Sequence, residues 1–198
     1  MSVKDFVQQR RDALIAMRRD FHMYPEPAWL EYRSAAKVAD RLISLGYDVA
    51  LGADVLDLDS RMGLPSDEVM KAAMDRAIEE GANLELVEKM GYGKTAIVAT
   101  MKFGGEGPVV AFRVDMDSND VIEAKEDNHV PAKGGFRSCH DKAMHACGHD
   151  AHMTMGLGLA EYLAAHKDEF KGTIKLIFQP AEEGVRGAKA MAEAGVVD

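Results

Sequence analysis

Apolar residues recur at helical spacing in two segments near the N-terminus. The first segment covers residues 3–21, where arginines fill the face opposite the apolar one. The second covers about residues 29–45 and stops before Gly46. Apolar positions three to four residues apart predict two amphipathic helices. The intervening Tyr24-Pro25-Glu26-Pro27 interrupts the first helix, because proline cannot continue it.

Short apolar runs between turn residues predict four strands. These runs cover residues 47–51, 95–103, 109–116 and 173–179. The third begins with the continuous apolar run Val109-Val110-Ala111-Phe112. A run without polar alternation is typical of a strand that is buried on both faces.

Three further helices complete the predicted pattern. One begins at the N-cap Ser66, reaches about Glu80 and lies in a segment, residues 52–93, that has the character of an insertion. The others cover about residues 150–166 and 186–194. The order of elements predicts an α/β fold with a mixed or largely parallel sheet flanked by helices.

Composition narrows the class of protein. The chain has 198 residues, of which 47% are hydrophobic and 29% charged, an ordinary globular balance. No run of about 18 apolar residues is present to form a membrane span. The formal net charge of −9 argues against a nucleic-acid partner. Two cysteines and no apolar leader segment favour a reduced, cytoplasmic protein.

Five of the seven histidines and both cysteines lie between residues 129 and 152. Within this cluster, Cys147 and His149 are two positions apart, so in an extended loop both can point the same way. Thiolate and imidazole are typical zinc ligands, and Gly148 between them permits unusual backbone angles. Asp150 could hold a ligand imidazole in one tautomer. The alternative is a buried free cysteine beside a helix-capping histidine.

Two predicted strands end in pairs of acidic residues. Asp115 and Asp117 follow one strand, and Glu182 and Glu183 follow the last. Ligands of open α/β sheets bind beyond the carboxyl ends of strands, so we expect both pairs on one rim. One carboxylate could bind a metal while its neighbour acts as a general base. The alternative for Glu182 and Glu183 is a solvated helix start.

Several other polar residues are expected to have structural roles. We interpret His22 as a structural hydrogen-bonding residue, and Glu26 and Glu31 as caps or buried partners. The adjacent Cys139 and His140 are a second possible ligand pair, but their polar, glycine-containing loop favours surface exposure.

Four sequence blocks, taken together and in order, resemble the aminoacylase/carboxypeptidase family of metal-dependent amidohydrolases. Within it the chain looks most like the branch that includes the A subunit of aminobenzoyl-glutamate hydrolase. The blocks are Arg18-Arg19-Asp20-Phe21-His22 with Pro25-Glu26 and Glu31, Ala111-Phe112-Arg113-Val114-Asp115-Met116-Asp117, residues 144–152, and residues 175–184.

This resemblance implies a zinc-exopeptidase-like catalytic domain. It assigns Cys147, His149 and Glu183 as metal ligands, Glu182 as the general base and Asp117 as a carboxylate that orients the site. The family normally binds two divalent ions, zinc or manganese. Its reaction is hydrolysis of the amide bond between an acyl or aroyl group and an amino acid.

The family pattern also contains elements that residues 1–198 do not include. Two further histidine ligands and a smaller dimerisation domain are expected downstream. We therefore expect an N-terminal part of a catalytic domain, with a partial or empty metal site, no activity alone, and self-association or a second protein as partner. The rival interpretations are a non-enzymatic metal-binding or interaction module, and a cysteine hydrolase with Cys147 as nucleophile.

Overall fold

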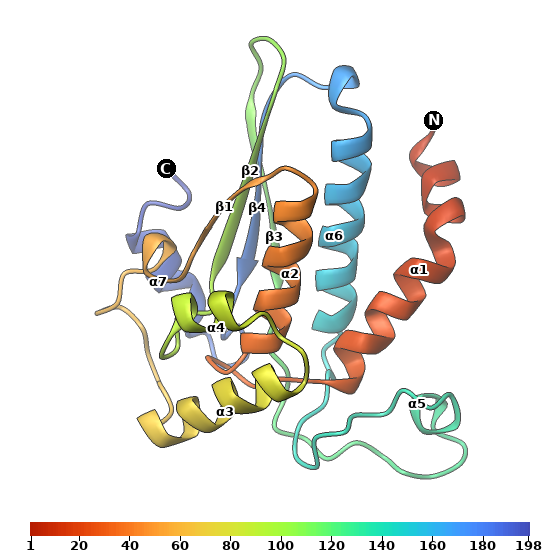
Figure 1. Ribbon diagram of the computed structural model, residues 1–198, viewed down its shortest axis with the longest axis vertical. Helices are drawn as coiled ribbons and strands as arrows, with labels where there is room; N and C mark the ends of the chain where they lie inside the picture. The colour runs from red at the N-terminus through yellow and green to blue at the C-terminus, as the bar shows by residue number, and fades with distance from the viewer.

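A four-stranded mixed sheet forms the centre of the molecule (Figure 1). The computed structural model describes residues 1–198. The strands β1 (Asp48–Leu51), β2 (Ile97–Phe103), β3 (Val109–Asp115) and β4 (Gly172–Gln179) have the spatial order β1-β2-β4-β3. The β1–β2 and β2–β4 pairs are antiparallel, and β3–β4 is parallel. The expected α/β class with a mixed sheet is confirmed, although the sheet is not largely parallel.

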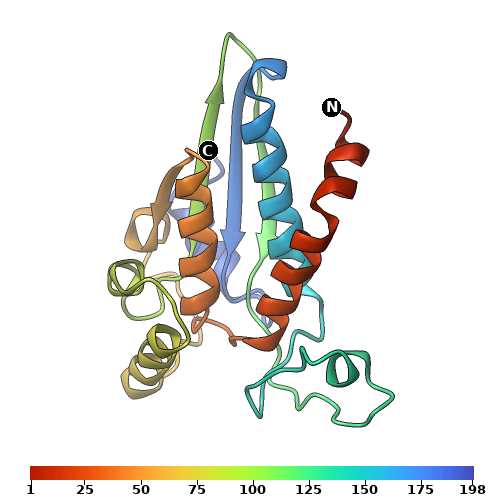
Figure 2. The same cartoon turned by 45° about the vertical axis from the view of Figure 1, so that its right-hand side comes forward.

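Three long helices cover one face of this sheet. α2 (Tyr32–Ser44) and α6 (His149–Ala165) lie side by side on the strands, and α1 (Val3–Met23) packs along α6 (Figure 2). The Tyr47 hydroxyl, at the entrance to β1, donates a hydrogen bond of 3.1 Å to the carbonyl oxygen of Ala160 in α6. Contacts with α1 and α2, together with the Tyr47 hydrogen bond, therefore fix the position of α6 relative to the strands.

Side chains that alternate along the strands pack into two apolar cores. In β4, Leu176 and Phe178 belong to a core of 25 buried residues under α2 and α6. Ile177 points to the opposite face, into a core of 10 residues that includes Met191 of α7 (Gly187–Glu193). This alternation is the period of two that a strand imposes on its side chains. Burial on both faces fixes the register of β4.

The segment 52–93 folds into three helices at one end of the sheet. They are η1 (Gly52–Val55), α3 (Asp67–Glu79) and α4 (Leu84–Met90). The predicted N-cap is confirmed, because the Ser66 side chain accepts the hydrogen bond of a backbone N–H in the first turn of α3. The seven-residue α4 was not predicted, since it is too short to show a clear helical period.

Strand β3 corrects one expectation. Its apolar run predicted burial on both faces, but β3 is an edge strand that pairs only with β4. The exposed fractions of Val109, Val110 and Phe112 are 65%, 38% and 43%. Val110 and Phe112 line an apolar groove of about 780 Å³ together with α1 and α6. An apolar run alone cannot show whether a second neighbouring strand covers it.

The remaining elements lie outside the sheet. α5 (Val130–Lys133) is a single turn within the long polar loop, and η2 (Lys167–Glu169) follows α6. None of the helices combines the length and apolar character that a membrane crossing requires.

Candidate metal centre

The parallel pairing of β3 and β4 brings two acidic loops to one rim of the sheet, as predicted. Asp117 follows β3 and is fully buried. Its two carboxylate oxygens accept hydrogen bonds from the backbone N–H groups of Glu182 (3.0 Å) and Glu183 (2.9 Å) after β4. One carboxylate therefore holds the turn that carries both glutamates.

His149 reaches the same rim from the first position of α6. Gly148 precedes it with a φ of 86°, in the left-handed region that favours glycine. The Nδ1 atom of His149 donates to the carbonyl oxygen of Asp117 at 2.7 Å. A carbonyl oxygen only accepts, so Nδ1 carries the hydrogen and Nε2 faces the glutamates. The distances from Nε2 to Glu182 Oε2 and Glu183 Oε1 are 3.7 and 3.9 Å.

These distances leave a gap that suits a cation. His149, Glu182 and Glu183 each offer one ligand atom, and the three atoms lie within 4.8 Å of one another. Glu183 Oε1 is buried and has no hydrogen-bond partner. Burial acts to lower the pKa of His149, but its contacts with Asp117 raise it to about 9. Without metal, the positive charge that faces the two carboxylates is therefore that of the imidazolium itself, and a metal would replace its Nε2 proton.

Cys147 lies beside this group rather than within it. Its side chain is exposed, and its Sγ receives the Asn119 amide hydrogen at 3.6 Å. The Asn119 side-chain oxygen also accepts the backbone N–H groups of Ala146 and Cys147, at 3.2 Å each. The neighbouring Glu183 carboxylate is the largest cause that raises the pKa of the Cys147 thiol. Cys147 therefore adjoins Glu183, whereas His149 and Glu183 face each other directly.

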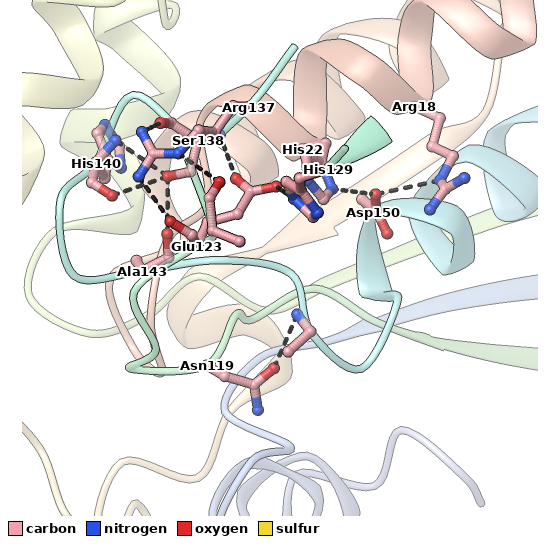
Figure 3. A network of polar contacts seen from close by, with 12 residues as sticks. Arg18, His22, Asn119, Glu123, His129, Arg137, Ser138, His140, Ala143 and Asp150 are labelled. Atoms are coloured by element: carbon pink, nitrogen blue, oxygen red, sulfur yellow. Dashed lines mark hydrogen bonds and ion pairs between the residues drawn. The ribbon is translucent and has the colours of Figure 1, made fainter. Parts of the chain in front are cut away.

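The orientation of Asp150 differs from the sequence expectation. Its carboxylate contacts His22 Nδ1 at 2.9 Å and Arg18 Nε at 3.2 Å, both in α1 (Figure 3). It does not contact His149, whose tautomer is held by Asp117 instead. Successive residues of a helix point about 100° apart, so neighbouring side chains face different partners. The structural role expected for His22 is confirmed.

A buried network anchors the long polar loop to the helices. The Glu123 carboxylate is buried and contacts His22 Nε2 at 2.9 Å and His129 Nε2 at 2.8 Å, and it accepts the Ser138 N–H at 2.5 Å (Figure 3). Burial acts to raise the pKa of Glu123, but these partners lower it. Part of the histidine cluster therefore fixes the loop rather than lining the rim.

Two residues at the rim, His152 and Glu31, were not assigned to a site from the sequence. His152 Nδ1 lies 3.3 Å from Asp115 Oδ2, and its ring stacks on His149 with centroids 5.2 Å apart. A helical spacing of three residues between the histidines could have signalled this pairing. Glu31 is a buried partner, as expected, and accepts from Thr95 Oγ1 (2.6 Å) and the Ala181 N–H (2.8 Å). Burial and the Asp117 charge raise the pKa of Glu31 to about 8.

The chain is similar to several known proteins. Residues 111–198 match Peptidase family M20/M25/M40. The chain is 49% identical to the A subunit of p-aminobenzoyl-glutamate hydrolase from Escherichia coli, covering 100% of this chain and 45% of that protein. The crystal structure of an aminobenzoyl-glutamate utilization protein from Klebsiella pneumoniae superposes with a TM-score of 0.83 at 43% identity, covering 100% of this chain and 43% of the other.

A second solved structure is a dinuclear metal binding peptidase of the M20 family from Bacillus subtilis. It matches with a TM-score of 0.67 at 29% identity, over 98% of this chain and 41% of the other. The chain is thus similar to peptidases of the M20 family, whose model matches residues 111–198, and the resemblance drawn from the four sequence blocks is confirmed. It spans less than half the length of these relatives.

Proposed function

We propose that this chain carries metal-binding and proton-transfer groups of an amidohydrolase. The observation that supports it best is the His149 Nε2 atom, which faces two glutamate carboxylates across 3.7 and 3.9 Å without a hydrogen bond. Cys147, His149 and Glu183 would hold divalent metal, with zinc or manganese as the candidates and two ions in the complete centre. Sulfur, nitrogen and carboxylate donors together suit zinc.

When bound, the metal polarises the scissile carbonyl and lowers the pKa of water. Glu182 is the proposed general base, because its carboxylate borders the same gap and is only half-buried. It would take the proton of the attacking water and deliver it to the nitrogen of the leaving amine, so that the amide becomes an acid and an amine. Asp117 would position both glutamates and His149 without touching substrate.

We further propose that the substrate is a small N-acyl or N-aroyl amino acid. The support comes from the relatives whose names contain aminobenzoyl-glutamate. Residues 1–198 would form the N-terminal part of the catalytic domain, with residues 52–93 as a helical insertion. Alone they would hold a partial site and lack turnover, because the resemblance assigns further histidine ligands. The remaining parts of the proposal are a cytoplasmic location, an oligomeric assembly and no nucleic-acid partner.

Calorimetric zinc and manganese titrations test the ligand assignment. We expect the wild-type chain to bind metal, His149→Ala to weaken binding at least about tenfold, and Glu182→Gln to retain it. Asp120→Asn is the control for a charge change near the site, since Asp120 is exposed in the loop that follows β3. Absence of binding to the wild-type chain at saturating metal would refute the retained site.

Hydrolysis of p-aminobenzoyl-glutamate tests the chemistry. We expect no turnover by the chain alone. Should turnover occur, we expect chelators and Glu182→Gln to abolish it. Turnover that survives Glu182→Gln would exclude the assigned base. Turnover that resists chelators but is lost on thiol alkylation would instead support a cysteine hydrolase.

A further inference from the structure

Glu80, Cys139 and His140 form a second cluster of metal-binding side chains, separate from the rim of the sheet. Each residue offers one ligand atom, and these atoms lie within 4.8 Å of one another. Glu80 caps the C-terminal end of α3, whereas Cys139 and His140 are neighbours in the long polar loop. The cluster therefore joins two parts of the chain that are 60 residues apart.

The His140 ring is held in an orientation that is common among metal ligands. Its Nδ1 donates to the carbonyl oxygen of Pro25 at 2.7 Å, which places the hydrogen on Nδ1. Its Nε2 is hydrogen-bonded to Glu80 Oε1, also at 2.7 Å, through a shared proton that a metal ion would replace. Ligating histidines typically donate one ring N–H to a carbonyl or carboxylate and bind the metal through the other nitrogen. Figure 3 shows His140 at the side of the loop network away from Arg18 and Asp150.

The Glu80 carboxylate has an unused acceptor. Its Oε2 atom is buried and has no hydrogen-bond partner. Leaving such an atom unpaired costs about 1–3 kcal/mol, so a binding partner is favoured. Glu80 also stands where the carbonyl groups of α3 leave a partial negative charge, which attracts cations. The nearby Arg33 is not a free cation, because its guanidinium is paired with Asp20 at 2.9 and 3.2 Å.

Cys139 supplies the sulfur donor from a fixed backbone position. Its backbone N–H and its thiol both donate to the Met23 carbonyl oxygen at the end of α1, each at 2.9 Å. Its side chain is exposed, so water can reach the remaining coordination position. Sulfur, imidazole nitrogen and carboxylate oxygen, with one water, make a four-coordinate set that zinc accepts.

We propose that Glu80, Cys139 and His140 bind a divalent cation of the zinc class, with water as the fourth ligand. Binding would widen the 2.7 Å contact between His140 Nε2 and Glu80 Oε1 to about 3.3 Å, the edge of a tetrahedron with bonds of about 2.0 Å. The cation would join the end of α3 to the loop that leads into Cys147. It would act as a structural clamp, independent of the proposed hydrolase centre.

Cobalt titration of a single-cysteine variant tests this proposal. The chain has two cysteines, so Cys147→Ser leaves Cys139 as its only thiol. We expect the Cys147→Ser protein to develop a thiolate-to-cobalt charge-transfer band, saturating at one equivalent and displaced by zinc. Adding His140→Gln or Glu80→Gln should weaken cobalt binding at least about tenfold. The matched control is Glu79→Gln, which changes the adjacent exposed glutamate. Absence of the band in folded Cys147→Ser protein, verified by circular dichroism, would overturn the proposal.

Limited trypsin digestion provides the second readout. Zinc should slow cleavage at Arg137 and Lys142 in the Cys147→Ser protein and leave the rate unchanged in Cys139→Ser/Cys147→Ser protein. Equal cleavage rates with and without zinc would refute the clamp. The Cys139→Ser protein reports separately on Cys147, so failure of the hydrolase centre and failure of this second site give different results.

Discussion

Replacing Asp117 with asparagine removes a charge that three groups of the rim share. Its carboxylate accepts the N–H groups of Glu182 and Glu183, and Oδ1 lies 3.4 Å from His149 Nδ1. Asparagine has nearly the same shape, so the substitution changes charge and hydrogen bonding without opening a cavity. Its single oxygen can accept one N–H, while its amide group turns a donor toward the other.

The expected loss of stability follows from these contacts. A hydrogen bond to a charged group contributes about 1.5–3 kcal/mol, and an unsatisfied buried N–H costs about 1–3 kcal/mol. We expect Asp117→Asn to lower the free energy of unfolding by about 2–4 kcal/mol, since one bond is kept in weaker form. For a domain of this size, that corresponds to a decrease in Tm of roughly 5–15 °C. Zinc affinity should fall about 10- to 100-fold.

Two measurements check this reasoning. Urea unfolding followed by circular dichroism gives the stability, and calorimetric zinc titration gives the affinity of the folded protein. Asp120→Asn makes the same chemical change at an exposed position of the same loop and should leave both unchanged. If Asp117→Asn retains the wild-type unfolding midpoint and zinc affinity, Asp117 does not organise the rim.

Three further predictions concern stability and assembly. Burial acts to raise the pKa of Glu161, but its partners Arg10 and Arg41 lower this pKa below 4.5. The ionised carboxylate therefore stabilises the fold above pH 4.5, and this stabilisation is lost as the pH falls through the folded-state pKa. Glu161→Gln should therefore lower the free energy of unfolding by about 1–2 kcal/mol at pH 7, a value reduced because both arginines are partly exposed to solvent, and by less at pH 3.5. An equal decrease at both pH values in urea unfolding experiments would contradict this. Gly187→Ala would place a Cβ 1.8 Å from the Pro180 carbonyl oxygen and should lower the free energy of unfolding by about 3 kcal/mol in the same assay. Its control is Gly104→Ala, whose Cβ would have no atom within 4 Å and should leave stability unchanged. The exposed edge of β3 should cause concentration-dependent association in sedimentation experiments, and Val110→Lys should reduce it; a wild-type chain that is monomeric at every concentration would refute this.

Local patterns predicted most of the elements because they depend on near neighbours. Helical periodicity located α1, α2 and α6 within a few residues, and Ser66 marked the start of α3. The acidic rim also followed, because Asp117 and Glu182 come directly after strands that proved to be parallel neighbours. These distant residues could be placed together because ligands of open α/β sheets bind beyond the carboxyl ends of the strands.

Features that depend on three-dimensional direction were not predictable in this way. The exposure of Val110 depends on how many strands flank β3, which its own sequence does not encode. The pairing of Asp150 with His22 depends on where α1 packs against α6. Similarly, Glu80 and His140 are in contact only because the polar loop passes the C-terminal end of α3. Each case needs the tertiary arrangement in addition to the local pattern.

The rim also has a consequence for the order of events in folding. The proposed ligands come from two segments, and the hydrogen bonds that Asp117 accepts from Glu182 and Glu183 join residues 65 and 66 positions apart. Of the proposed rim ligands, only Cys147 and His149 are close in sequence, and Glu183 follows His149 by 34 residues, unlike the ligands of a zinc finger. Metal capture at the rim should therefore follow β3–β4 pairing, a slow step for strands joined by a long crossover. The rate of metal uptake during refolding would then report the rate at which β3 and β4 pair.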